Sequence, residues 1–217
     1  YTNHADFQQT NAINELLTQE TGGVTEGFMN RIVLPLTGVY SENNHVLGHE
    51  LTHAFHYDIM KSSNAGVTGG SQIPLWFIEG MSEYLTIGTF APLTSMWMRD
   101  AVLFDDVPSI EMVSKNPSYF PYRYGHAIWA FIAGSFGDDI INPLFESVLQ
   151  NGWNQGFVLT LGTPVDSLSI DWESSTVQHF RDLIKNKKKP AETGNQIINN
   201  SSINLAPVLS PDGKLIA

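Results

Sequence analysis

The pentapeptide His49-Glu50-Leu51-Thr52-His53 constrains this chain more than any other segment. On a helix, residues four positions apart lie on one face, so both imidazoles can reach a common point. Two imidazoles at this spacing are typical zinc ligands, and the glutamate between them is placed to act on a water molecule as a general base. About one chain in a hundred of this composition would carry the pattern by chance, so the spacing alone does not establish a zinc site.

The residues around the pentapeptide favour a helix. Side-chain oxygens that can cap its N-terminus come from Ser41 and from Asn43 or Asn44. Apolar residues at helical spacing predict a core-facing side, made of Val46, Leu47, Leu51, Ala54 and Phe55.

A catalytic zinc ion needs a third protein ligand, and the segment 74–85 offers one. Pro74 suits the first turn of a helix, and apolar residues follow it at helical spacing: Trp76, Phe77, Met81, Tyr84 and Leu85. Glu79 is a carboxylate among these residues and needs a partner such as a metal ion. Glu83 lies one turn further on the same face, where it can accept the second N–H of a ligating histidine, with His49 as the expected partner. A solvent-exposed acidic stripe is the alternative interpretation.

A third segment completes a set of motifs. Residues 121–125 read Pro-Tyr-Arg-Tyr-Gly and lead into an apolar helix expected at 126–133. Together with the His-Glu-x-x-His helix and the Trp-x-x-Glu-Gly of residues 76–80, this order resembles the gluzincin metallopeptidases. The aminopeptidase N and leukotriene A4 hydrolase type enzymes are the related group with these motifs.

The resemblance implies a role for each matching residue. His49, His53 and Glu79 would hold Zn²⁺. Glu50 would be the general base, and Tyr122 would stabilise the negative charge that develops on the carbonyl oxygen. This chemistry suits the residue types, because a carboxylate can move the proton of an attacking water and a phenol can donate to an oxyanion without carrying charge itself.

Other assignments for the third segment stay open. Tyr122 is alternatively a core tyrosine within an aromatic cluster, and Tyr124 replaces it if the helix has a different register. His126 lies four residues after Tyr122 and is therefore a candidate neighbour of the site.

The chain also departs from the family pattern. Aminopeptidases of that group carry a Gly-x-Met-Glu-Asn segment whose glutamate holds the substrate's free amino group, and this chain has none. Glu26 is nearby, but its surroundings do not mark it as a replacement. The β-rich run at 31–36 predicts an edge strand, along which an extended peptide can pair by strand addition. Endopeptidase or processing activity is therefore predicted as readily as aminopeptidase activity.

Composition excludes some classes of partner. The net charge is −11, so nucleic acid is not expected to bind, because phosphate recognition requires clustered positive charge. The basic run at 185–189 is more simply a solvated helix end. No apolar run approaches the roughly 18 residues of a membrane span. The chain begins at Tyr1 and no signal peptide is visible, which predicts that the sequence is a trimmed piece. It contains no cysteine, so disulfide bonds cannot be used to infer an oxidising or reducing compartment.

The periodicity of the remaining chain predicts a mainly α (α+β) fold. The resemblance implies a thermolysin-like catalytic domain with a small N-terminal sheet and a helical bundle. Further helices are expected at 6–20, 93–104, 109–115, 138–152 and 169–187. The peptidase domain is assigned to 1–187 and a polar linker to 188–203.

The C-terminal segment 204–217 has a different character. Its Ser-Pro-Asp-Gly-Lys run at 210–214 is a strong turn signal between two short strands and resembles the hairpin of a TolB-like β-propeller repeat. The resemblance implies a peptidase domain followed by a propeller, a bacterial arrangement that is secreted, periplasmic or at the cell envelope. An ordinary surface hairpin is the alternative.

Three functions compete at this point. The first is a zinc metallopeptidase acting on a peptide or protein. The second is a catalytically silent binding module of the same fold attached to a propeller. The third is a zinc hydrolase with a non-peptide substrate such as an epoxide, as in one member of the resembled family. A peptide-cleavage assay with and without Glu50→Gln separates the first two, and a profile of cleaved peptides removes the third.

Overall fold

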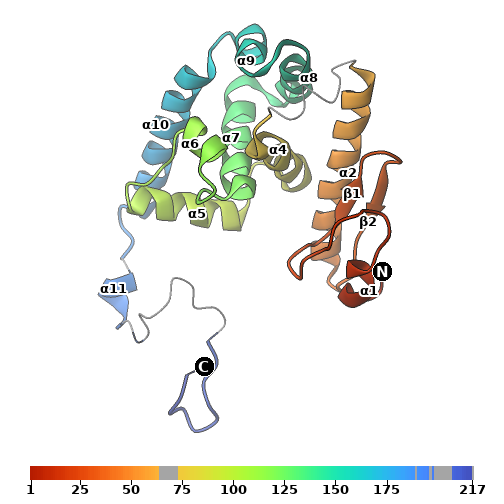
Figure 1. Cartoon of the computed structure of the whole chain (residues 1–217). Coiled ribbons are helices and arrows are strands. Elements are labelled where there is room, and N and C mark those ends of the chain that lie inside the picture. The colour runs from red at the N-terminus through yellow and green to blue at the C-terminus, as the bar shows by residue number, and fades with distance from the viewer. Residues whose placement is uncertain (64–72, 189, 196, 198–206, 217) are drawn as a thin grey trace. The chain divides into compact units, whose positions relative to one another are not determined.

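The computed structural model describes residues 1–63, 73–188, 190–195, 197 and 207–216. The chain divides into two units, Tyr1–Asp182 and Leu183–Ala217. Helices dominate the first unit, and its two-stranded sheet precedes the long helix α2 (Figure 1). The prediction of a mainly helical fold with a small N-terminal sheet is therefore confirmed. Within the described residues, no helix has the length and apolar character needed to cross a membrane.

The N-terminal part contains α1 (His4–Gln8) and a hairpin of β1 (Val24–Glu26) and β2 (Arg31–Val33). The strands are antiparallel, with Val24 opposite Val33. The predicted helix at 6–20 is wrong beyond Gln8. Thr10 there accepts a hydrogen bond from the backbone N–H of Ala12, and such side-chain bonds compete with helical ones. Leu16 is 95 % exposed, so a longer helix here would not be stabilised by the packing of an apolar face.

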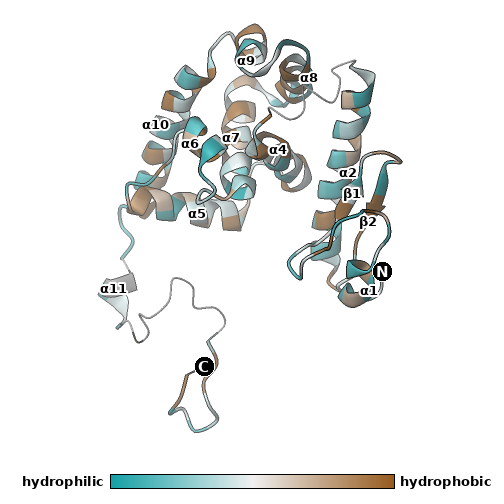
Figure 2. Ribbon diagram, viewed as in Figure 1, coloured by the Kyte–Doolittle hydropathy of each residue, from teal (hydrophilic) through white to brown (hydrophobic). Residues whose placement is uncertain are grey.

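Helix α2 (Tyr40–Ser62) buries polar side chains and exposes apolar ones, and hydrophilic residues recur along its length (Figure 2). Its buried residues are His49, Glu50, Thr52 and His56. The predicted apolar face is therefore wrong at Leu47, Leu51 and Phe55, which are exposed. The predicted caps are wrong as well, because Val39 occupies the N-cap position without a side-chain bond. Asn43 instead accepts a hydrogen bond from the backbone N–H of Thr37.

The remaining helices of the first unit form a bundle around an apolar core. They are α4 (Leu75–Ile87), α5 (Pro92–Leu103), α6 (Ile110–Lys115), α7 (Pro121–Phe136), the 3₁₀ turn η1 (Asp138–Ile140), α8 (Ile141–Asn151), α9 (Trp153–Leu161) and α10 (Val165–Ile184). Fully buried aromatic residues include Trp76 and Phe77 of α4 and Trp129 of α7. The indole N–H of Trp129 donates to the Phe77 carbonyl at 2.8 Å, which joins the two central helices.

Helices α4 and α7 cross in direct backbone contact. A Cβ atom added to Gly80 would lie 2.3 Å from the carbonyl carbon of Gly125, and one added to Gly125 would lie 2.4 Å from the Trp76 oxygen. Only glycine permits this approach. The glycines of the Glu-Gly and Pro-Tyr-x-x-Gly motifs therefore have a structural role, and they place Glu79 on α4 near the N-terminal turn of α7.

Helix α9 was not predicted from the sequence. Glycines at 152, 156 and 162 are typical of breaks between elements. Gly152 and Gly162 do end helices with positive φ angles of 81° and 71°. Gly156 lies inside α9, where a Cβ atom would be 2.6 Å from the Cα of Val148 in α8. Close packing of two helices, rather than a turn, explains this glycine.

The second unit contains α11 (Pro190–Thr193) and a short hairpin. Helix α11 falls inside the segment predicted as linker, 188–203, of which 189, 196 and 198–203 are outside the described residues. The predicted turn is confirmed: Gly213 has a φ of 68°, and Leu209 and Ile216 form an antiparallel bridge. Residues 204–206 and 217 of the predicted propeller fragment are outside the described residues as well.

Candidate metal centre

Helices α2 and α4 lie side by side and bring together the three predicted ligands, His49, His53 and Glu79 (Figure 1). The Nε2 atoms of the two histidines are 3.0 Å apart. Oε2 of Glu79 is 3.0 Å from Nε2 of His49 and 3.2 Å from Nε2 of His53. All three residues are buried or partly buried. We call this group the ligand cluster.

The ligand cluster fits a zinc ion. Tetrahedral zinc with bonds of about 2.0–2.1 Å holds its ligand atoms about 3.3 Å apart, close to the three distances of the cluster. Two imidazole nitrogens and one carboxylate oxygen are also a ligand set that catalytic zinc commonly uses. Three protein ligands leave a fourth position of a tetrahedral ion for water or substrate.

The protonation of the cluster follows from its close contacts. Burial alone would lower the pKa of His49, but hydrogen bonds to Glu79 and Glu83 outweigh it and raise that pKa to about 9. Burial would likewise raise the pKa of Glu79, whereas hydrogen bonds from His49 and His53 lower it to about 2. The carboxylate charge is therefore held beside the imidazoles, where a cation would be stabilised.

Glu83 makes the contact that its spacing predicts. Its Oε1 accepts from Nδ1–H of His49 at 3.0 Å and from Nε2–H of His45 at 2.9 Å. Its Oε2 accepts from Arg123 of α7 at 2.8 Å. Burial opposes ionisation, but these two histidine hydrogen bonds and the Arg123 charge hold the pKa of Glu83 well below its usual range. Since Nδ1 of His49 donates to Glu83, its Nε2 is directed to the ligand cluster.

A second potential ligand group overlaps the first. His45, His49 and Glu83 also bring one ligand atom each within 4.8 Å of one another. The guanidinium of Arg123 already pairs with Glu83 there, and its positive charge disfavours a cation. Among the described residues, the cluster with Glu79 is therefore the better metal site.

Glu50 is held by the hairpin. Its Oε2 accepts a 2.7 Å hydrogen bond from the Thr25 hydroxyl of β1, and the side chain is buried. Gly23 approaches it closely, because a Cβ atom there would be 2.9 Å from Cγ and 3.1 Å from Oε1 of Glu50. The strand therefore fixes the position of the predicted general base. Glu26, in contrast, binds the backbone N–H groups of Phe28 and Met29 in its own turn.

Tyr122 lies against the cluster at the start of α7. Its ring stacks on His49 with centroids 5.7 Å apart and an angle of 21° between the planes. Burial, the charge of Glu79 and a hydrogen bond to Glu79 raise its pKa far above the usual value. The phenol therefore keeps its proton and can donate it in a hydrogen bond. Phe120 stacks on the same tyrosine ring at 5.1 Å.

The structure places the other two predicted neighbours outside the ligand cluster. Nε2–H of His126 donates to the carbonyl of Gly88 at 2.8 Å, which holds the C-terminal end of α4. Tyr124 packs edge-on against Tyr119 and Trp97. One position on a helix turns a side chain by about 100°, so Tyr122 and Tyr124 face different surroundings.

His56 is a buried histidine one turn after His53. Its ring lies 4.7 Å from that of Phe145, and neither ring nitrogen has a hydrogen-bond partner in the described part of the chain. Burial, with the charges of His53 and His49, lowers its pKa to about 3.

We expect the free energy of unfolding to fall as pH decreases from about 6.5 towards 4.5, because the unfolded chain then binds a proton that folded His56 does not. This one group contributes at most about 1.4 kcal/mol per pH unit. Urea unfolding of wild type and His56→Leu in EDTA measures the effect, and a slope unchanged by the substitution would contradict it. His49, with its raised pKa, contributes a slope of opposite sign near pH 6.5, and this slope fades as the pH falls through the window because the unfolded histidine becomes protonated as well.

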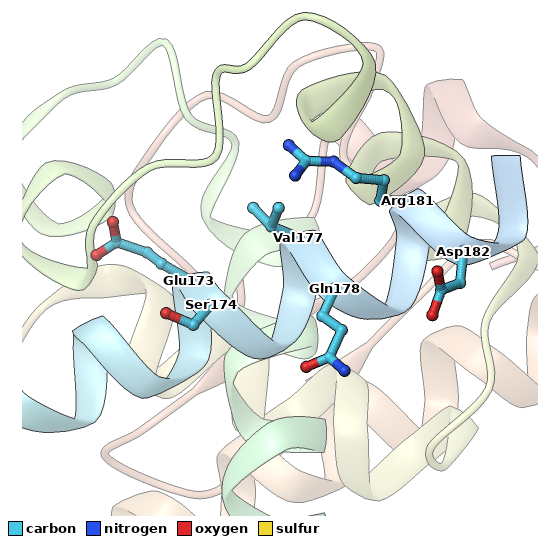
Figure 3. A pocket seen from close by; sticks show the side chains of 6 residues that line it. All are labelled: Glu173, Ser174, Val177, Gln178, Arg181 and Asp182. Atoms are coloured by element: carbon cyan, nitrogen blue, oxygen red, sulfur yellow. The ribbon is translucent and has the colours of Figure 1, made fainter. Parts of the chain in front are cut away.

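A separate groove runs along α10 and has a volume of about 490 Å³ (Figure 3). Its lining residues are Glu173, Ser174, Val177, Gln178, Arg181 and Asp182. All of them belong to one helix, and none belongs to the ligand cluster or contacts it. Arg181 is 3.7 Å from Asp105, an exposed ion pair that contributes little to stability.

Sequence reasoning missed several residues that support the site. Thr25 holds Glu50, Arg123 and His45 hold Glu83, and the Ser82 hydroxyl lies 3.4 Å from Nδ1 of His53. Of these residues, only Ser82 could have been identified from the sequence, because it lies three residues after Glu79 on the same face of α4. The other contacts depend on which helices and strands meet.

No family model, curated protein sequence or solved structure matches this chain in the comparisons.

Proposed function

We propose that this chain is a zinc-dependent metallopeptidase domain of the gluzincin type. The observation that carries the proposal is the convergence of His49, His53 and Glu79 on one point, with Tyr122 stacked on His49. The cluster holds two imidazoles and a carboxylate, which suit zinc better than magnesium or calcium. A bound zinc ion would polarise the scissile carbonyl and lower the pKa of a water molecule.

The chain's own residues supply the proton transfers. Glu50 takes a proton from the attacking water and passes it to the leaving amine. Thr25 holds one of its carboxylate oxygens, which limits the positions that the base can adopt. Tyr122 donates a hydrogen bond to the carbonyl oxygen as negative charge develops on it. Its raised pKa supports this role, because a protonated phenol is the donor form.

A peptide or protein is the proposed substrate. Strand β1 carries Thr25 next to Glu50, so a chain that pairs with this hairpin passes close to the proposed base. Strand addition uses backbone hydrogen bonds and accepts many sequences. The Glu26 carboxylate is occupied by its own turn, so an endopeptidase or processing peptidase is favoured over an aminopeptidase.

Metal removal tests the proposal directly. We expect purified protein to contain about one zinc per chain, and to lose hydrolysis of an unstructured protein such as casein after dialysis against a chelator. Added Zn²⁺ restores it. The double variant His49→Ala/His53→Ala should retain no zinc, measured by elemental analysis. Full zinc content in that variant, or hydrolysis that survives chelation, would refute the proposed site.

Gly23→Ala tests the position of the base without altering any proposed catalytic residue. A Cβ atom at residue 23 would press on Glu50 and on Val46, 2.8 Å away, and so displace the carboxylate. Misplacement by about 1 Å can cost about a hundredfold in rate. We expect kcat to fall about 10- to 100-fold while zinc content stays unchanged. Gly38→Ala is a poor control because its φ is 81°, so Gly134→Ala, with open space at Cβ, is the matched variant.

A further inference from the structure

Ser82 of α4 is fully buried beside the ligand cluster. Its hydroxyl donates to the backbone carbonyl of Ile78 at 3.1 Å, four residues earlier in the helix. The same oxygen lies 3.4 Å from Nδ1 of His53. Because the hydroxyl proton points to Ile78, the oxygen lone pairs remain free to accept.

This arrangement selects one form of His53. An acceptor at Nδ1 requires a proton on that nitrogen, so the lone pair of the neutral ring is on Nε2. Nε2 is the atom that faces His49 and Glu79, at 3.0 and 3.2 Å. A contact of 3.4 Å is long for a hydrogen bond, and such contacts commonly tighten when a site is occupied.

Residues 79, 82 and 83 lie at positions i, i+3 and i+4 of α4 and therefore share one face. We propose that Ser82 is the positioning residue for His53, as Glu83 is for His49, so that this single turn supplies one ligand and orients both imidazoles. The inference rests on the proposed zinc site. Ser82 would act through His53 and would not touch substrate.

Zinc affinity tests the role of Ser82. Loss of the group that orients a ligating histidine typically weakens metal binding 10- to 100-fold. We expect Ser82→Ala to weaken Zn²⁺ binding by about tenfold or more, measured by competition with a chromophoric chelator. Ser82→Thr keeps the hydroxyl and should recover most of the affinity. Ser62→Ala is the matched control, since Ser62 also donates to a carbonyl four residues earlier, at 2.9 Å, but contacts no imidazole.

NMR of the wild-type full chain provides a readout that does not depend on a variant folding. We expect the Nδ1 proton of His53 to be observed, with a nuclear Overhauser contact to the Ser82 β protons and its ¹⁵N shift typical of a protonated nitrogen. Wild-type affinity retained by Ser82→Ala would overturn the assignment and leave the metallopeptidase proposal intact. If the wild type binds no zinc, the proposed function fails, and the NMR contact alone decides whether Ser82 orients His53.

Discussion

Glu50→Gln is expected to lower the kcat for peptide hydrolysis by about 10²- to 10⁴-fold, the usual contribution of a general base. The substitution removes the group that takes the proton from water but keeps the size of the side chain. The amide oxygen can still accept from Thr25, so the position of the residue is retained. Zinc content should not change, because the ligand cluster consists of His49, His53 and Glu79.

Glu42→Gln is the matched control, because Glu42 lies in the first turn of the same helix, is exposed, and precedes the pentapeptide by seven residues, about two helical turns. It should retain wild-type kcat. Two results would count against a catalytic Glu50. One is hydrolysis at the wild-type rate in the glutamine variant, and the other is zinc-loaded protein that hydrolyses nothing in either form. The second result would favour a silent binding module.

Gly125→Ala is expected to have the largest effect on stability. The new Cβ atom would lie 2.4 Å from the Trp76 oxygen and 2.9 Å from Cα of Gly80, and both are backbone atoms that no rotamer change can move. Helices α4 and α7 must therefore separate. Overpacking in a core typically costs about 1–3 kcal/mol, and a backbone clash belongs at the upper end or beyond. Gly80→Ala should lower the free energy of unfolding by a similar amount, because its Cβ atom would meet the Gly125 backbone.

The kcat of the folded fraction should also fall in this variant, because the crossing sets the distance between Glu79 on α4 and Tyr122 on α7. Thermal unfolding and kcat of the surviving folded protein measure the two effects. Gly134→Ala in the same helix is the control, since its Cβ meets nothing within 4 Å. Replacing glycine by alanine inside a helix stabilises by about 0.5–1 kcal/mol, so this variant should melt no lower than wild type. Equal melting of Gly125→Ala and wild type would contradict the packing argument.

Local spacing predicted which side chains share a face of each helix, and the structure brings His49, His53 and Glu79 together. The i, i+4 relation of His49 and His53, and of Glu79 and Glu83, follows from helix geometry whatever the tertiary structure. The contact between Glu83 and His49 was predicted on the further premise that Glu79 is a ligand of the same metal ion as His49, since Glu83 lies one turn along the same face. What the spacing left open was the side of α2 that would be buried, and apolar residues such as Leu47 and Leu51 indicated the wrong side.

Contacts between helices and strands account for the other differences between the predicted and the observed structure. Polar groups of α4 compensate the buried histidines, and that pairing is not visible in the sequence of α2 alone. Gly156, which indicates a break inside α9, serves close packing against α8 instead. The prediction of a helix at 6–20 is wrong beyond Gln8 because Leu16 is exposed and does not pack in the core. His126 and Tyr124 were at permissible spacings, but the packing of α7 gives them other neighbours.

The crossing of α4 and α7 at Gly80 and Gly125 also bears on motion. Two helices in backbone contact, with no side chains between them to change rotamer, resist sliding and hinging. The proposed ligand Glu79 and the phenol of Tyr122 should therefore move as one rigid body. An opening that admits the proposed peptide substrate is then expected where Thr25 of the three-residue strand β1 joins Glu50 through its hydroxyl group. In hydrogen exchange, amides of β1 should open well before those at the helix crossing.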